Sequence, residues 1–255
     1  MHAQCYATKR PRKEQPLAIQ SFLKLLLWPG PKTVFEIGAC EGEDTVRYAR
    51  LFPYARFFLF EPLPANQKSI RRRLATHGEI RASLHRIALS DLNGESILYV
   101  SSGTNPVDNQ AGNKSSSLLK PAKLPKEFSW IKCRKQIKVP TMRLEMFCRG
   151  KGIRTIDYIH MDVQGAELKV LEGAGRMIAK IGLVWMEVSF QPAYHGQPFE
   201  SQASEWMRTK GFRKVTQISY GAEADALFLN MRFFSAWGKL ILLKIFLRMG
   251  LIRFR

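Results

Sequence analysis

The chain has 255 residues, of which 45% are hydrophobic and 11% aromatic, and this composition excludes a polypeptide too polar to build a core. Its 40 Lys and Arg residues against 21 Asp and Glu give a formal charge of +19. Such an excess favours an anionic partner, either nucleic acid, acidic lipid headgroups or an acidic glycan.

A basic arm and a short helix are predicted first, over residues 1–31, and the helix at 17–28 is closed by Pro-Gly-Pro at 29–31. Over residues 32–231, strand-like apolar runs alternate with helical patterns. Strands are predicted at 33–38, 55–62, 81–89, 136–142, 156–163, 182–190, 212–219 and 224–231, and further helices at 43–52, 65–78, 143–152, 166–180 and 199–211. This alternation is typical of βαβ units, so it predicts an α/β fold with a Rossmann-like, doubly wound, mostly parallel sheet and a terminal antiparallel pair.

A polar segment interrupts the alternation at residues 101–130. It is rich in Ser, Asn, Gly, Pro and Lys. A loop of this length inside a compact domain is usually either functional or disordered.

The last segment, residues 232–255, is apolar and basic and predicts a helical tail. Its aromatic, Leu and Ile residues fit a helix lying in a membrane interface, which would give peripheral membrane association. At about 100° per residue, however, Lys244 and Arg248 share one face while Lys239 and Arg253 fall nearly opposite, so there is no single polar stripe. Packing of the tail on the domain, or on a second copy in a homo-oligomer, is the alternative.

The four cysteines and the N-terminus predict the compartment. The cysteines form no CxxC pair and have no histidine companion at metal-ligand spacing, which indicates free thiols in a reducing setting. The first 15 residues lack the apolar stretch of a signal peptide, and no run of about 18 apolar residues could span a membrane. The sequence therefore predicts a cytoplasmic protein.

Glycines and acids follow the first two strands. The first strand runs into the pattern Glu36-x-Gly38-x-x-x-Gly42, and Glu61 ends the second strand. Glycines allow a tight turn and let a ligand lie against the backbone, and an acid at the second position can accept hydrogen bonds from both hydroxyls of a ribose. A strand-end acid beside an ordinary turn is the alternative, but Glu61 at this spacing favours a nucleoside-binding crevice.

The type of nucleoside follows from the glycine spacing and the charge. A dinucleotide fold requires G-x-G-x-x-G, which is absent here, and the acids at positions 36, 41, 43 and 44 are hostile to a pyrophosphate. They suit a cationic ligand instead. S-adenosylmethionine, with its sulfonium and α-amino groups, fits better than NAD.

Six stretches carry a resemblance to a known family. They are "EIGACEG", "FEPLP", "IALSDLNG", "SSSLLKP", "IDYIHMDVQGAELKVLEGAG" (156–175) and "MEVSFQPAYHGQPF", in this order. Over roughly residues 32–230 the chain resembles the FkbM family of S-adenosylmethionine-dependent methyltransferases. The resemblance implies a seven-stranded sheet of the class I methyltransferase type and methyl transfer to a hydroxyl, often on a sugar, glycolipid or natural product.

The resemblance also implies site residues. The cofactor-binding residues are Glu36, Gly38, Ala39, Gly42, Glu61, Pro62, Ala88, Leu89, Asp91 and Asp162, with Glu61 at the ribose and Asp162 beside the transferable methyl. Three positions depart from the family pattern: Glu36 stands where Asp is common, His160 where Lys is usual, and Gln164 where Glu is common. We expect His160 to point to the other side of its strand from the neighbouring site residues.

A hydroxyl acceptor must lose its proton, and three side chains are candidate catalytic bases. They are Asp162, Glu187 and His195, of which Asp162 is the first choice because it ends a strand within the most specific stretch. Each has a plain alternative: a helix cap, a loop-positioning group and a surface residue, respectively. No HExxH or comparable ligand set occurs, so we expect no metal.

We therefore predict an O-methyltransferase that acts on a hydroxyl of a glycan, glycolipid or other small molecule, with residues 101–130 and 191–199 shaping the acceptor pocket. Two alternatives stay open: a nucleoside-binding protein without catalysis, and an RNA methyltransferase that uses its basic surface. A nucleic-acid partner is not favoured, because no known nucleic-acid module and no aromatic stacking platform are evident.

Overall fold

The computed structural model describes residues 17–104, 112–122 and 130–233. The predicted basic arm before residue 17 and nearly all of the predicted tail, from residue 234 on, lie outside the described residues. Within the described ranges, no helix has the length and apolar character that crossing a membrane would require.

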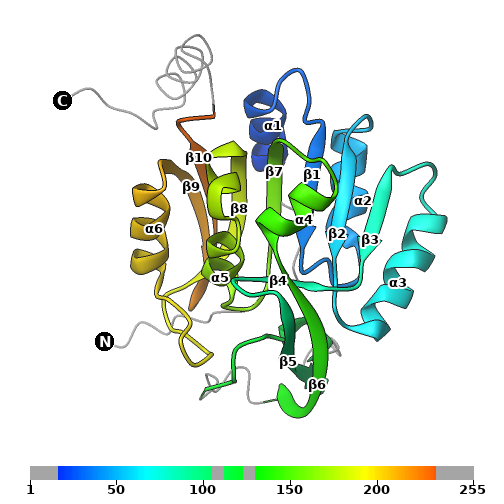
Figure 1. Cartoon of the computed structure of the whole chain (residues 1–255), viewed down its shortest axis with the longest axis vertical. Helices are drawn as coiled ribbons and strands as arrows, with labels where there is room; N and C mark the ends of the chain where they lie inside the picture. The colour runs from blue at the N-terminus through cyan, green and yellow to red at the C-terminus, as the bar shows by residue number, and fades with distance from the viewer. Residues whose placement is uncertain (1–16, 105–111, 123–129, 234–255) are drawn as a thin grey trace, which may run out of the picture.

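A seven-stranded sheet forms the centre of the molecule, in the order β3-β2-β1-β7-β8-β10-β9 (Figure 1). Its strands are β1 (Thr33–Ile37), β2 (Arg56–Phe60), β3 (Ala82–His85), β7 (Ile156–Met161), β8 (Ile181–Ser189), β9 (Phe212–Tyr220) and β10 (Glu223–Asn230). The first five are parallel, and β10 runs antiparallel to both β8 and β9. The predicted seven-stranded, mostly parallel sheet with a terminal antiparallel pair is confirmed, and its strand order reverses between β1 and β7.

Strand β1 lies inside this sheet, and all five of its residues are buried. It pairs with β2 on one side and with β7 on the other, where Val34 faces Tyr158. The start of β1 is also fixed to β7: the backbone amides of Lys32 and Thr33 donate to Asp157 Oδ2 at 2.8 and 2.9 Å.

Helices cover both faces of the sheet, as a doubly wound fold requires. They are α1 (Leu17–Leu26), α2 (Glu43–Leu51), α3 (Pro64–Ala75), α4 (Leu144–Gly150), α5 (Glu167–Glu172) and α6 (Glu200–Thr209). One core cluster joins α1, α2 and α3 to inward-facing residues such as Tyr158 and Trp185. The other joins α4, α5 and α6 to the opposite face, around Phe35 and Met186.

The structure corrects the sequence analysis in the stretch 81–102. The predicted strand 81–89 is two strands, because the chain leaves the large sheet after β3 and starts β4 (Ala88–Ser90) in a second sheet. This sheet has the order β4-β6-β5 and includes β6 (Lys132–Arg143), which is longer than predicted, and β5 (Gly94–Ser102), which was missed. The second sheet projects from the carboxyl ends of β1 and β2 (Figure 1).

The predicted helix 166–180 is also divided. Helix α5 ends at Glu172, and a 3-10 helix, η3 (Gly175–Lys180), follows. A Cβ at Gly173 would lie 2.0 Å from the carbonyl oxygen of Ser90, so the end of α5 packs directly against the backbone of β4. Gly175 then takes a φ of 50°, which breaks the helix before η3.

Candidate functional site

A pocket opens where the strand order reverses, the place at which doubly wound sheets bind ligands. It has about 600 Å³ of empty space, its open mouth included. The lining comes from β1 and its turn (Ile37, Gly38, Cys40), β2 and α3 (Phe60, Glu61, Pro62, Asn66), the second sheet with the residue before β4 (Ile87, Ala88, Leu89, Leu98), the 3-10 helix η1 (Gly112–Ser115) with the residues after it (Lys114, Ser116, Ser117, Leu118) and the turn after β7 (Asp162, Val163, Gln164, Ala166).

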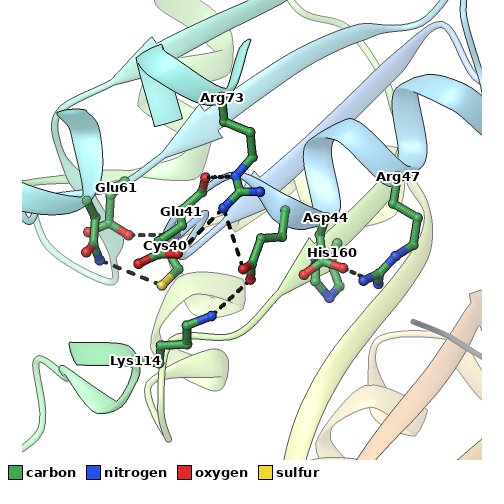
Figure 2. A network of polar contacts seen from close by, with 10 residues as sticks. Cys40, Glu41, Asp44, Arg47, Glu61, Arg73, Lys114 and His160 are labelled. Atoms are coloured by element: carbon green, nitrogen blue, oxygen red, sulfur yellow. Dashed lines mark hydrogen bonds and ion pairs between the residues drawn. The ribbon is translucent and has the colours of Figure 1, made fainter. Parts of the chain in front are cut away.

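Glu61 is the best-defined acid of this pocket. Its carboxylate accepts hydrogen bonds from the backbone amides of Cys40 and Leu63, both at 2.8 Å, and Figure 2 shows the first of these two bonds. It is nevertheless 95% buried, and burial raises the pKa of Glu61 to about 7 against the lowering effect of these two amides. The Asn66 side chain is a further hydrogen-bond donor to Glu61. A buried carboxylate held in place at the pocket wall can also accept hydrogen bonds from hydroxyl donors.

Gly38 is required by the close approach of two strands. Its φ is 79°, and a Cβ at this position would lie 2.0 Å from the carbonyl oxygen of Asp162. That oxygen cannot move easily, because the Asp162 amide donates to the carbonyl of Ile37 at 3.0 Å. Gly42, with a φ of 76°, starts α2 as its N-cap but does not line the pocket.

The acids around the glycine turn are largely paired, which corrects the charge argument drawn from the sequence (Figure 2). Arg73 on α3 lies 3.6 Å from the carboxylates of both Glu41 and Glu43. Lys114 lies 3.0 Å from Glu43, and Arg47 lies 2.5 Å from Asp44. The turn is thus surrounded by ion pairs and not by uncompensated negative charge.

Glu36 lies beneath the turn and outside the pocket lining. Its carboxylate accepts a short hydrogen bond from the Thr45 hydroxyl, and burial, followed by the nearby Asp44, raises its pKa well above the usual value. His160 pairs in register with Glu36 on the neighbouring strand and points to the same side, with Nδ1 4.0 Å from Asp44. His160 does not line the pocket, in contrast to Asp162 at the end of the same strand.

These three side chains could hold a cation by spacing alone, since their ligand atoms lie within 4.8 Å of one another. His160 Nδ1 is buried and finds no hydrogen-bond partner among the described residues. Asp44 is already paired with Arg47, however, and a guanidinium beside a ligand opposes a divalent ion. We therefore interpret the group as a partly buried polar cluster that supports the turn.

Of the remaining cofactor-binding residues implied by the sequence, some line the pocket and others do not. Pro62, Ala88 and Leu89 line the pocket together with Gly38, Glu61 and Asp162. Ala39 is buried beside it without lining it. Asp91 pairs instead with Lys169 at 3.1 Å, and its pKa is lowered by hydrogen bonds from Ser90 and Lys169, which outweigh its burial.

Two of the three candidate bases, Asp162 and Glu187, are connected by hydrogen bonds to the same side chain. Gln164 donates through Nε2 to Asp162 Oδ1 at 2.7 Å and to Glu187 Oε2 at 3.0 Å. Asp162 lines the pocket, and Glu187 is 6% exposed behind it. The His195 side chain is exposed and does not line the pocket.

Several pocket residues were not identified from the sequence. They include Cys40, Asn66, Leu98, Lys114, Ser116, Ser117 and Leu118. Four of them come from the polar segment predicted as a loop, which is held in place by a bridge between Ser117 and Tyr99 of β5. The stretch "SSSLLKP" was quoted for the family resemblance and could have served as a signal. Burial raises the pKa of Cys40 to about 12, so its thiol stays protonated.

Comparisons with known proteins identify the family of the chain. The model of the methyltransferase FkbM domain matches residues 36–214. The chain is 32% identical over 214 residues to the 2-O-methyltransferase NoeI of Sinorhizobium fredii, covering 84% of this chain and 85% of that protein.

Two solved structures with a related shape are methyltransferases as well. Precorrin-6y C5,15-methyltransferase of Geobacter metallireducens is 11% identical, with a TM-score of 0.46 over 87% of this chain and 90% of that one. Magnesium protoporphyrin IX methyltransferase of Synechocystis PCC 6803, solved with bound S-adenosylmethionine, is 8% identical, with a TM-score of 0.48 over 84% and 77%. On the family match and the NoeI relative, the chain belongs to the FkbM family of S-adenosylmethionine-dependent methyltransferases.

Proposed function

We propose that this methyltransferase acts on a hydroxyl of a glycan, glycolipid or other small molecule. The observation that carries the proposal is the pair of carboxylates, Asp162 and Glu187, that Gln164 holds together at the edge of the pocket. The similarity to a 2-O-methyltransferase supports the same choice of acceptor atom. Hydroxyl methylation needs a proton acceptor, and these carboxylates are suited to that task.

The residues of the pocket fit the cofactor. Glu61 would hold the two ribose hydroxyls, Ala88 and Leu89 would contact the adenine, and the bare backbone at Gly38 leaves room for the methionine portion. When bound, S-adenosylmethionine supplies a methyl group on a positively charged sulfur.

The chain's own contribution would be orientation and proton acceptance. Asp162 lies at the carboxyl end of β7 with its backbone bonded to Ile37 and its side chain bonded to Gln164, so its direction is fixed before any ligand binds. A fixed acceptor for the hydroxyl proton raises the rate by proximity and by general-base catalysis. Glu187 would orient the acceptor or share its proton.

Asp162→Asn is expected to lower kcat by about 10²–10⁴-fold, the usual contribution of a general base, with cofactor affinity changed much less. The measurement is release of S-adenosylhomocysteine with a panel of mono- and oligosaccharide acceptors, together with calorimetric titration of the cofactor. Glu187→Gln and His195→Ala are the comparison variants. A larger loss in either of them would move the base away from Asp162.

The same assay separates the alternative functions. Cofactor binding without turnover on any acceptor would favour a nucleoside-binding protein without catalysis. Salt-sensitive methylation of RNA would favour an RNA methyltransferase. Peripheral membrane association through residues 232–255, assembly with a second copy and a cytoplasmic location stay predictions.

Lys114 is expected to contribute to cofactor affinity, because it is the only Lys or Arg among the described residues that line the pocket. We expect Lys114→Met to weaken S-adenosylhomocysteine binding about tenfold, by loss of a charged partner for the methionine carboxylate. Affinity for methylthioadenosine, which lacks that carboxylate, should not change. The control is Lys120→Met, which removes a charge from an exposed position outside the lining. Equal losses for both ligands would exclude this role.

A further inference from the structure

Beyond the pair of carboxylates, we propose that Gln164 is a positioning residue: its single neutral amide holds Asp162 and Glu187 in the arrangement needed to receive an acceptor hydroxyl. The proposal rests on the proposed function for its catalytic meaning. Its structural content, that one amide connects two carboxylates, can be tested without turnover.

The contacts of Gln164 tie four parts of the chain together. Its Nε2 donates to Asp162 at the end of β7 and to Glu187 on β8, at 2.7 and 3.0 Å. Its backbone carbonyl accepts from the Ser117 hydroxyl at 2.8 Å. The Tyr194 hydroxyl, which lies 2.7 Å from the carbonyl of Ser115, is also 3.3 Å from Gln164 Oε1. Gln164 thus connects both candidate catalytic groups to two segments that border the pocket.

The chemistry of the neighbours determines which way this amide faces. Two carboxylates approach one end of it, and each can accept a hydrogen bond, so the nitrogen must point toward them and the oxygen toward the Tyr194 hydroxyl. Both amide hydrogens are then used, one for each carboxylate. An amide donates these hydrogens without losing a proton, so neither carboxylate has to be protonated in order to be held.

The backbone supports the same interpretation. Gln164 is 8% exposed and has a φ of 55°, in the left-handed region that side-chain-bearing residues rarely adopt. Such a conformation persists where surrounding contacts over-determine it, and it occurs most often at functional sites. Here the conformation directs the side chain between β7 and β8.

A glutamate at position 164 would change the number of protons that this group of carboxylates binds near neutral pH. Gln164→Glu is nearly isosteric, but it would bring three carboxylates into one buried group, and like charges at this spacing retain a shared proton. The titratable side chains around the group are Cys40, Cys133, Asp162, Glu167, Glu187, Tyr194, Tyr220, Glu223 and Asp225. The three carboxylates of the variant should therefore hold one proton near neutral pH.

The experiment compares the pH dependence of kcat/KM and of the melting temperature in the wild type, Gln164→Glu and Gln197→Glu. Gln197 is the matched control, because its Oε1 accepts from the backbone amides of Ala193 and Tyr194, at 2.7 and 3.2 Å, and a carboxylate can do the same. In Gln164→Glu, the acid limb of kcat/KM should move at least one unit toward higher pH. In Gln197→Glu it should stay in place.

The measurement of melting temperature tests the bridging role of Gln164 without requiring an active enzyme. A carboxyl group whose pKa is raised by folding stabilises the protein at low pH, and this contribution is lost as the pH rises through the folded value. The melting temperature of Gln164→Glu relative to the wild type should therefore fall between pH 5 and pH 8, while that of Gln197→Glu stays parallel to the wild type. Gln164→Met, which removes both donors without adding charge, should lower kcat about tenfold or more at unchanged cofactor affinity.

The two possible failures are distinguishable. A wild type without turnover, but with the expected melting behaviour in Gln164→Glu, would overturn the proposed function and keep the bridging role. An active wild type whose pH profile and melting behaviour are reproduced by Gln164→Glu would overturn the role of Gln164. Wild-type kcat in Gln164→Met would overturn it as well.

Discussion

Replacement of Gly38 by alanine is expected to destabilise the protein by about 3 kcal/mol or more, since the new Cβ would lie 2.0 Å from the Asp162 carbonyl oxygen at a positive φ. In a domain of this size, the melting temperature should fall by about 6–12 °C. The measurement is urea or thermal unfolding followed by circular dichroism. Cofactor binding should also be lost at temperatures where the variant is still folded, because relief of the clash separates β1 from β7 at the pocket.

Gly78→Ala is the matched control. Gly78 has nearly the same φ, 78°, but a Cβ there would meet nothing within 4 Å. It therefore reports the cost of the backbone conformation alone, about 1–2 kcal/mol. Equal destabilisation by the two substitutions would show that the close approach to Asp162 contributes nothing.

Glu61→Gln is expected to weaken S-adenosylmethionine binding about 100-fold at pH 8. The variant loses a charged acceptor for two hydroxyls, and its amide nitrogen opposes the backbone donors of Cys40 and Leu63. The pH dependence is equally diagnostic. Burial raises the pKa of Glu61 to about 7, and hydroxyl donors favour its ionised form, so wild-type affinity should fall as the pH drops below 7, approaching tenfold per unit.

Glu167→Gln is the control that separates the effect of Glu61 on cofactor binding from the effect of removing any buried carboxylate. Burial raises the pKa of Glu167 to about 7 as well, and its carboxylate also accepts from backbone amides, those of Val163 and Gly165 at 3.0 and 3.3 Å. Glu167 does not line the pocket, so its variant should keep the wild-type pH dependence of binding. The measurement is calorimetric titration of the cofactor between pH 5.5 and 8.5. If Glu61→Gln kept the wild-type pH dependence of binding, Glu61 would not be the group that holds the ribose.

The same pKa predicts a change in stability. Because the folded pKa of Glu61 is raised above its ordinary value of 4.5, its contribution to stability is full below that value and is lost as the pH rises through about 7. The glutamine variant should therefore gain stability relative to the wild type between pH 5 and pH 8.

The central sheet could be predicted from the sequence because its strands are apolar runs of the expected length, separated by helical patterns. The division between β3 and β4 could not, since Arg86 and Ile87 are neither glycine nor proline and nothing local marks the change of sheet. Strand β5 was missed for a related reason. It has few buried residues, and it is defined by its pairing with β6, which is distant in sequence.

The residues of the site likewise divide into those that the sequence predicts and those that only the fold brings together. Gly38, Glu61 and Asp162 were predicted because each ends a strand, and parallel strands bring their ends to one edge. Lys114 was not, because it reaches the turn at Glu43 across 71 residues. The pairing of Arg73 with Glu41 also depends on which face α3 turns toward α2, and charge counting along the sequence does not contain that information.

The position of β1 has a consequence for synthesis of the chain. One edge of β1 pairs with β2 soon after both emerge from the ribosome, but its other edge waits for β7, whose Asp157 is separated from Lys32 by 125 residues. At about 5–20 residues per second, roughly 6–25 s pass before that partner is made. During this interval a fully buried strand has an unpaired edge, the arrangement that promotes aggregation. The nascent chain, more than the finished enzyme, is therefore the form in which this edge is open to aggregation.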